Sequence, residues 1–211
     1  MADSERFNIK GFTVAIFGSA RIKRGSMIYR EIHELARMIG EAGMNIVTGG
    51  GPGLMNAASE GHRAGRRSSE AKAIGLRIKL PFKEVESSHL DIKREFDRFS
   101  HRLDEFMSIA NAVVVAPGGV GTLLELAYTW QLLQVKHISN VPVILLGDMW
   151  LDFLEWVKRW PLKHQLLDPE DAALLRPARN IQEAFKIIME TYQKYANANT
   201  DETKFNRLTQ P

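Results

Sequence analysis

The chain contains five short, uninterrupted apolar runs, and stretches with helical spacing separate them. The runs span residues 12–18, 44–50, 73–78, 112–119 and 141–147. Strands that are buried on both faces lack polar alternation, and such runs are typical of a parallel sheet covered by helices. Strand–helix–strand repetition also implies right-handed crossovers. The sequence therefore predicts an α/β fold, a doubly wound and mostly parallel sheet with helices on both faces.

Helical periodicity is clearest between the first two runs, where apolar residues repeat from Ile28 to Ile39 and Gly43 follows as a stop signal. Further helices are predicted over residues 54–64, 96–109, 122–134, 150–160 and 181–195. A chain of 211 residues forms one hydrophobic core of this type. We therefore expect a single domain over residues 1–195, and the polar, unpatterned residues 196–211 predict a flexible C-terminal tail.

Composition excludes several classes of protein. The chain has no cysteine, which rules out disulfides and thiolate metal sites, and its six histidines show no ligand spacing, so no metal is expected. No run approaches the roughly 18 apolar residues of a membrane span, and the first residues lack an apolar leader segment. A net charge of +3 with interspersed signs is a weak argument for nucleic acid. We expect a cytoplasmic protein that binds neither membrane nor nucleic acid.

Three glycine-containing loops follow apolar runs that are predicted to be strands. In doubly wound sheets ligands bind beyond the carboxyl ends of the strands, so these loops are expected to meet. A glycine loop that opens a helix brings backbone N–H groups and the positive end of the helix dipole close to an anion. The predicted phosphate-binding residues are Gly18 and Ser19 in the first loop, Gly49, Gly50, Gly51 and Gly53 in the second, and Gly118, Gly119, Val120, Gly121 and Thr122 in the third.

One such loop taken alone does not distinguish a phosphate site from a tight turn, but two of them at the same edge of the sheet favour a phosphate site. No Gly-Lys-Ser/Thr sequence follows them, and their spacing is not that of the dinucleotide fingerprint. A nucleoside monophosphate therefore fits better than ATP or NAD.

Glu125 follows the third loop, and its position needs a reason. If the helix begins at Thr122, Glu125 lies on the same face in the first turn, where the helix dipole favours the ionised form. A carboxylate opposes binding of phosphate alone, but it stabilises positive charge that develops on a ribosyl ring when an N-glycosidic bond breaks. The alternative is a glutamate that caps the helix.

The segment PGGVGTLLE, residues 117–125, resembles the PGGxGTxxE motif of the LOG family. The segments TGGGPGLMNAASEGHRAG, residues 48–65, and AIGLRIKLPFKE, residues 73–84, resemble the family's second glycine motif and the strand and loop after it. Members of the family are cytokinin riboside 5'-monophosphate phosphoribohydrolases, often mislabelled as lysine decarboxylases. The resemblance covers residues 14–195 and implies a Rossmann-like homodimer that needs no cofactor. It also implies hydrolysis of nucleoside 5'-monophosphates to free base and ribose 5-phosphate.

The family also carries an arginine–lysine pair on the helix before the PGG strand. Arg102 matches the arginine, whereas Leu103 stands in the place of the lysine, which puts rate and substrate choice in doubt. The resemblance assigns catalysis to Glu125 and Arg102. As a hypothesis from their place in the first loop, Ser19 and Arg21 assist in binding the ligand. Without the resemblance, Arg102 is interpreted as one of several solvated helix charges.

Two other classes of function remain to be weighed. A non-catalytic nucleotide-binding or regulatory protein would keep the glycine loops and would not need the lysine that Leu103 replaces. A lysine decarboxylase would need pyridoxal phosphate, and no segment resembles the lysine-bearing sequence that binds this cofactor. The tryptophans at helical positions indicate core packing or a dimer contact, and Asn56 is either a ligand contact or a packing and capping residue. The preferred base cannot be read from the sequence.

Overall fold

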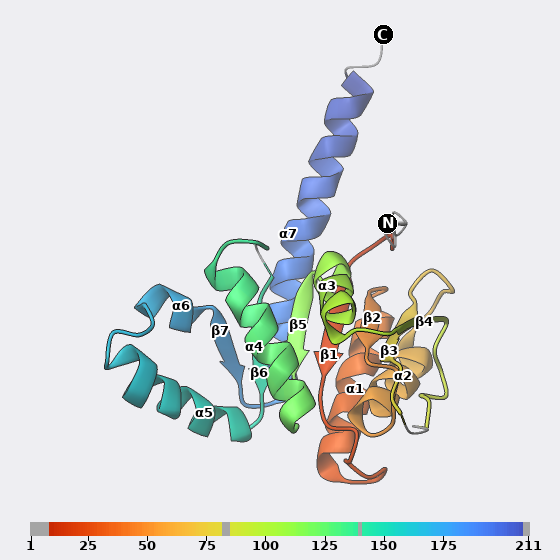
Figure 1. Ribbon diagram of the computed structural model, residues 1–211. Coiled ribbons are helices and arrows are strands. Elements are labelled where there is room, and N and C mark those ends of the chain that lie inside the picture. Colours follow the sequence, from red (N-terminus) through yellow and green to blue (C-terminus); the bar gives the residue numbers. More distant parts are fainter. Residues whose placement is uncertain (1–8, 82–84, 139–140, 209–211) are drawn as a thin grey trace.

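The computed structural model describes residues 9–81, 85–138 and 141–208, with side chains to residue 198 (Figure 1). Its described strands form one seven-stranded, all-parallel sheet in the order β4-β3-β2-β1-β5-β6-β7. The strands are β1 (Thr13–Phe17), β2 (Asn45–Thr48), β3 (Ala73–Ile78), β4 (Ile92–Phe96), β5 (Ala112–Val115), β6 (Val143–Leu146) and β7 (Leu175–Ala178). The helices are α1 (Met27–Glu41), α2 (Leu54–Gly65), α3 (Phe99–Ile109), α4 (Val120–Gln134), α5 (Met149–Val157), α6 (Pro169–Ala173) and α7 (Ile181–Leu208).

The predicted fold class is confirmed, and all five apolar runs contain strands. The sequence did not reveal β4 and β7, which are the two edges of the sheet. Residues of β4 alternate between half-buried and exposed, and β7 carries Arg176 and Pro177 on its exposed positions. Edge strands tolerate charge and proline because one side of the strand needs no ladder partner, so neither strand has the sequence pattern of a buried strand.

Several helix ends differ from the prediction, and three of them have a clear cause in the sequence. α3 begins at Phe99 rather than residue 96 because Phe96 pairs with Ile78 as the end of β4. α5 ends at Val157, and the next turn, η1 (Lys158–Leu162), is a π-helix that accommodates Pro161. α7 continues to Leu208, because no glycine or proline interrupts the segment predicted to be a tail. Residues 82–84 of the third motif and 209–211 lie outside the described residues.

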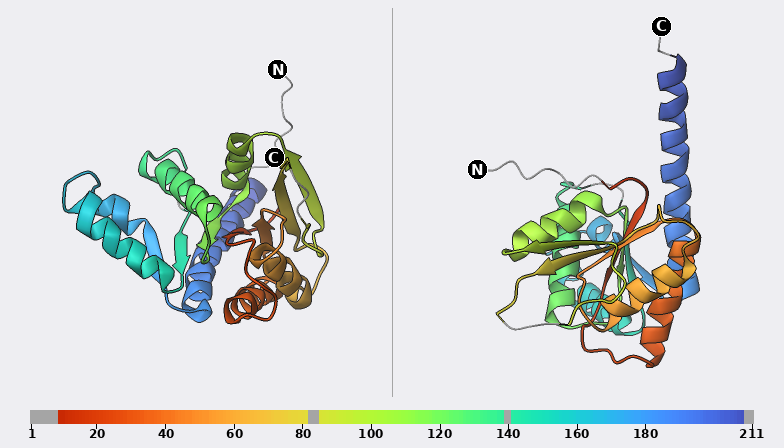
Figure 2. Two further views of the ribbon diagram at one scale, coloured as in Figure 1. Left: turned by 60° about the horizontal axis from the view of Figure 1, so that its bottom comes forward. Right: turned by 90° about the vertical axis from the view of Figure 1, so that its right-hand side faces the viewer.

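Helices cover both faces of the sheet (Figure 2). Val14 and Ile16 of β1 face one side and pack in a cluster with α1, α2 and α7. Ala15 and Phe17 face the other side and pack in a second cluster with α3, α4 and α5. This alternation along a single strand is the two-residue period of β structure, and it explains why β1 is apolar from Val14 to Phe17. None of the described helices is both long and apolar enough to cross a bilayer.

Two glycines allow α1 and α2 to cross in close contact. A Cβ atom added at Gly61 would lie 1.9 Å from the carbonyl oxygen of His33, and one added at Gly65 would lie 1.9 Å from that of Arg37. Between them, His62 is fully buried, and its Nε2 lies 2.8 Å from the carbonyl oxygen of Met44, to which it donates. Only glycine permits backbone-to-backbone packing at these two positions.

Replacing Gly61 with alanine is expected to lower the free energy of unfolding by about 1–3 kcal/mol, because the methyl group overlaps the backbone of α1. Urea denaturation measures the change. Gly121→Ala is the matched control: its methyl group would meet no described atom within 4 Å, so helix propensity alone predicts unchanged or higher stability. Equal loss of stability in the two variants would contradict the close crossing.

Candidate functional site

The pocket that the loops form lies where the strand order of the sheet reverses. β1 lies between β2 and β5, and the chain runs outward from this point in both directions. The loops after β1 and β5 leave the sheet side by side at its carboxyl edge, which is the usual ligand position in such folds. The sheet topology therefore brings the first and third glycine loops together, as the sequence predicts.

The backbone of Ser19 connects all three loops. Its N–H donates to the carbonyl oxygen of Pro117 over 3.1 Å, and its carbonyl oxygen accepts from the N–H of Leu54 over 3.0 Å. Gly53 precedes Leu54 with φ +65°, and a Cβ there would lie 2.4 Å from the Ser19 carbonyl oxygen. The second loop approaches the first this closely only because residue 53 is glycine.

The pocket has a volume of about 490 Å³, in the range of small-molecule sites. It is lined by most of the residues that the sequence singles out: Gly18, Ser19, Arg21, Gly49, Arg102, Gly119, Val120, Gly121, Thr122 and Glu125. Four predicted residues do not line it: Gly50, Gly51, Gly53 and Gly118. Two of them instead contact Ser87. The N–H of Ser87 donates to the carbonyl oxygen of Gly50, and its hydroxyl donates to that of Gly51.

Helix α4 begins at Val120, earlier than the predicted start at Thr122. Gly119 is the N-cap, and no side chain caps it, so the N–H groups of the first turn open toward the pocket. These groups and the helix dipole form an anion-binding environment. The hydroxyl of Thr122 lies beside Gly118, where a Cβ would be only 2.1 Å from Thr122 Oγ1.

Because of this earlier start, Glu125 lies in the second turn rather than the first. Its carboxylate accepts from Nη2 of Arg102 over 3.0 Å, and both residues are less than a tenth exposed. The capping alternative for Glu125 and the solvated alternative for Arg102 are both wrong. The two helices that bracket β5, α3 and α4, together form this buried ion pair.

The guanidinium of Arg102 retains unused hydrogen-bonding capacity. It lies 5.6 Å from the ring centroids of both Phe99 and Phe106, and its buried Nε has no hydrogen-bond partner among the described residues. A Cβ at Gly49 would approach Nη1 to 3.3 Å, so glycine leaves room for this side chain. A buried N–H without a partner is unfavourable, and an acceptor atom of a bound ligand would satisfy it.

Burial raises the pKa of Glu125 to about 7, and the positive charge of Arg102 partly offsets this shift. The prediction that the helix dipole favours the ionised form is therefore wrong here. Desolvation dominates because the carboxylate is enclosed and lies two residues farther from the helix start than predicted. A carboxyl group with a pKa near neutrality can exchange a proton with a bound molecule.

Other residues of the pocket had no distinct sequence signal. In the sequence, Met55, Leu80 and Phe99 do not differ from ordinary core residues. Arg77 is different, because a charge that interrupts the apolar run of β3 near its carboxyl end indicates a residue of the pocket. Arg77 forms an ion pair with Glu86. Leu103, which stands in the place of the family's lysine, is buried and does not line the pocket.

Asn56 has structural partners rather than a place in the pocket lining. Its Nδ2 donates to Tyr29 Oη over 2.9 Å, and its Oδ1 accepts from the N–H of Ser88 over 2.9 Å. These contacts support the packing alternative for Asn56. Among the described residues, no cluster of three or more histidine, aspartate or glutamate side chains is arranged to hold a metal ion.

The pKa of Glu125 predicts a dependence of stability on pH. Unfolding returns this pKa from about 7 to its ordinary value of 4.5, so the folded state binds the proton more tightly. The protonated carboxyl therefore adds to the free energy of unfolding below pH 4.5, and this contribution is lost as pH rises through about 7. We expect the free energy of unfolding to fall by about 1–3 kcal/mol over this range. Urea denaturation of wild type and Glu125→Gln across this range measures it.

The difference in unfolding free energy between wild type and Glu125→Gln should change between pH 4.5 and about 7. Glu155→Gln is the control, because Glu155 is exposed and pairs only at the surface with Lys158. Its unfolding free energy should follow that of wild type. If the unfolding free energies of wild type and Glu125→Gln differ by the same amount at every pH, the pKa of Glu125 is not raised.

The fold and the pocket define a doubly wound α/β protein with an uncapped helix start beside a buried arginine–glutamate pair. A family model described as "possible lysine decarboxylase" matches residues 55–188, which is more than half of the chain. The chain therefore belongs to this family, the LOG family that its motifs resemble.

One similar curated protein is the pyrimidine/purine nucleotide 5'-monophosphate nucleosidase of Escherichia coli K12. It is 29% identical over 143 residues, which make up 64% of this chain and 30% of the relative. The match thus spans less than a third of the relative's length.

Solved structures with a similar fold include molybdenum cofactor proteins. The molybdenum cofactor binding protein of Rippkaea orientalis has a TM-score of 0.65 and 20% identity, covering 87% of this chain and 98% of the other. The molybdenum cofactor carrier protein of Chlamydomonas reinhardtii has a TM-score of 0.59 and 22% identity, covering 86% and 98%. At these identities the likeness concerns the fold alone.

Proposed function

We propose that this chain hydrolyses the N-glycosidic bond of nucleoside 5'-monophosphates, including AMP and cytokinin-type monophosphates, to free base and ribose 5-phosphate. The observation that carries the proposal is the buried Arg102–Glu125 pair beside the open start of α4. The Escherichia coli relative is named a nucleotide 5'-monophosphate nucleosidase, which supports the same substrate class.

The 5'-phosphate is held at the start of α4. The N–H groups of Gly119, Val120 and Gly121 and the hydroxyl of Thr122 are the donors on this side of the pocket. Ser19 and Arg21 add a hydroxyl and a positive charge from the loop after β1. A nucleoside without phosphate makes none of these charge-assisted contacts and is expected to react poorly.

Glu125 acts on the ribose, because it lies one turn deeper in the pocket than the phosphate donors. As the bond from C1' to the base nitrogen breaks, positive charge develops on the ring, and the carboxylate stabilises it. Water adds to C1' and gives a proton to Glu125, and the departing base nitrogen takes up a proton from solvent, to which Glu125 later returns its own. A pKa near 7 allows Glu125 to accept the proton from water and release it after each turnover.

Arg102 holds Glu125 in position and uses its remaining N–H groups to contact the ligand. Nη2 is bonded to Glu125, whereas the buried Nε is without a partner among the described residues. An acceptor on the departing base or on the phosphate satisfies this donor. Cation–π contacts with Phe99 and Phe106 help to hold the guanidinium in place.

Glu125→Gln is expected to lower kcat by about 10²–10³-fold while the protein stays folded, because the variant loses an oriented charge in the transition state. Chromatography measures release of free base and ribose 5-phosphate from a panel of nucleoside 5'-monophosphates and from the matching nucleosides. Glu155→Gln, on the exposed face of α5, is the matched control and should retain full turnover.

Two outcomes would contradict the proposal. Unchanged turnover in Glu125→Gln would remove Glu125 from the reaction. Saturable binding of a monophosphate with no release of base from any member of the panel would instead support a non-catalytic nucleotide-binding protein. Thermal denaturation of each variant separates loss of activity from loss of fold.

We also propose that two copies of the chain associate through α4. Val120, Leu124 and Ala127 are exposed on this helix, and their spacing places them along one stripe that the exposed C-cap residue Val135 continues. Exposed apolar stripes of this kind mark contact surfaces between proteins. The partner would then cover the helix whose first turn lines the pocket.

Leu124→Glu is expected to reduce the mass in solution to that of one chain, 23.8 kDa, because the charge would be buried in the interface. Light scattering after size-exclusion chromatography measures the mass. Leu166→Glu, at an exposed position outside α4, is the control and should leave the dimer intact. A wild-type mass of one chain would overturn the dimer.

A further inference from the structure

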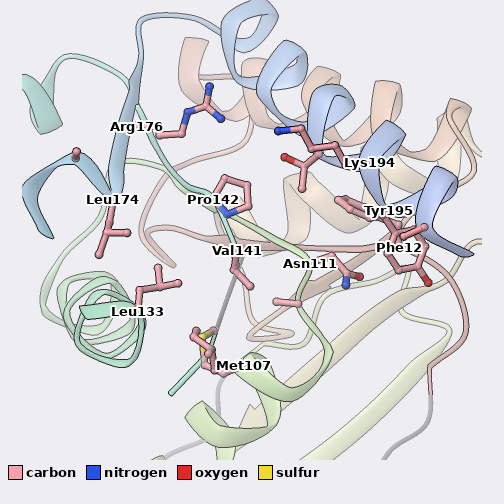
Figure 3. Close-up of a pocket in the computed structure, with 15 residues that line it drawn as sticks. Phe12, Met107, Asn111, Leu133, Val141, Pro142, Leu174, Arg176, Lys194 and Tyr195 are labelled. Atoms are coloured by element: carbon pink, nitrogen blue, oxygen red, sulfur yellow. The ribbon is translucent and has the colours of Figure 1, made fainter. Parts of the chain in front are cut away.

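A second, larger pocket of about 870 Å³ lies at the opposite edge of the sheet (Figure 3). Four of its lining residues, Phe12, Asn111, Pro142 and Leu174, immediately precede β1, β5, β6 and β7. Because all strands are parallel, these residues mark the amino edge, whereas the candidate active site lies at the carboxyl edge. The second pocket is therefore separate from the first.

The floor of the second pocket is apolar. Met107 comes from the end of α3 and Leu133 from the end of α4, and both are largely buried. Val141 adds a third aliphatic side chain from the segment before β6, and Tyr195 of α7 closes one end. Such a surface binds hydrocarbon by the hydrophobic effect and offers little to a strongly polar molecule.

Two cations from different elements stand on one side of this floor. Figure 3 shows Arg176 of β7 and Lys194 of α7 on the side of the pocket opposite Leu133 and Met107. Lys194 has no ion-pair partner in the described part of the chain. Arg176 has Glu190 at 3.7 Å, and both side chains are nearly half exposed, so this pair is weak.

No aspartate or glutamate is among the described residues that line the pocket. A positively charged rim above an apolar floor is complementary to a molecule with one negative end and one apolar end. Neutral or cationic amphiphiles would leave Lys194 without a counter-charge and Arg176 with only its weak pair to Glu190. We propose that this pocket binds a small amphiphilic carboxylate, with its head between Arg176 and Lys194 and its apolar body over Met107, Leu133 and Val141.

Isothermal titration calorimetry with hexanoate, octanoate and decanoate, each below its critical micelle concentration, tests the proposal. We expect saturable binding at one site per chain. Affinity should rise by about fourfold for each added methylene, because each one is transferred from water to the apolar floor. Decanol, which has the same chain but no charge, should bind at least 10-fold more weakly than decanoate.

The double variant Arg176→Gln/Lys194→Gln should bind decanoate at least 10-fold more weakly than wild type, because it loses both counter-charges. Both side chains are exposed or half exposed, so folding should be unaffected. Arg179→Gln/Lys186→Gln is the matched control. It also removes one arginine and one lysine, both exposed and outside the pocket, and should leave the affinity unchanged.

Three results would overturn the proposal. They are the absence of saturable decanoate binding, equal binding of decanol and decanoate, and equal affinity in wild type and the double variant. Self-association that the same double variant abolishes would also overturn it, by assigning the pocket to a second copy of the chain. None of these readouts depends on catalytic turnover, so the proposal stands or falls independently of the activity at the carboxyl edge.

Discussion

The two hydrogen bonds of the Ser19 backbone hold the three loops of the carboxyl edge as one unit. One bond reaches Pro117 after β5, and the other reaches Leu54 at the start of α2. The parallel sheet brings the ends of β1 and β5 together, and these peptide contacts join the loops that follow them. The positions of Gly49 and Thr122, and hence the space left for Arg102 and Glu125, follow from that connection.

Within this frame, burial and Coulomb attraction oppose each other at Glu125. Desolvation raises the pKa of the carboxyl to about 7, although Arg102 donates to it over 3.0 Å. A fully solvated glutamate would be a permanent anion, and a buried one without a cation would be permanently neutral. The ion pair with Arg102 keeps the pKa of Glu125 between these two extremes, so a small change in the surroundings of the carboxyl changes its charge.

Much of the fold and part of the site could be predicted from sequence, and the limits have physical causes. Central strands buried on both faces must be apolar throughout, so their runs are visible, whereas the edge strands β4 and β7 carry charges and are not. The glycine loops could be recognised in the sequence because glycine is needed where two backbone segments come into close contact. The contact between Arg102 and Glu125 depends on how α3 and α4 pack, and spacing along the chain does not encode it. The motif resemblance assigned both residues to catalysis but did not predict their ion pair.

Helices α3 and α4 each extend from one pocket to the other. On α3, Arg102 lines the carboxyl-edge pocket and Met107 lines the amino-edge pocket; on α4, Glu125 and Leu133 have the same relation. An α-helix transmits a displacement along its axis with little internal deformation. Any ligand that shifts either helix at one edge therefore changes the free energy of binding at the other, and thermodynamic linkage makes this effect reciprocal.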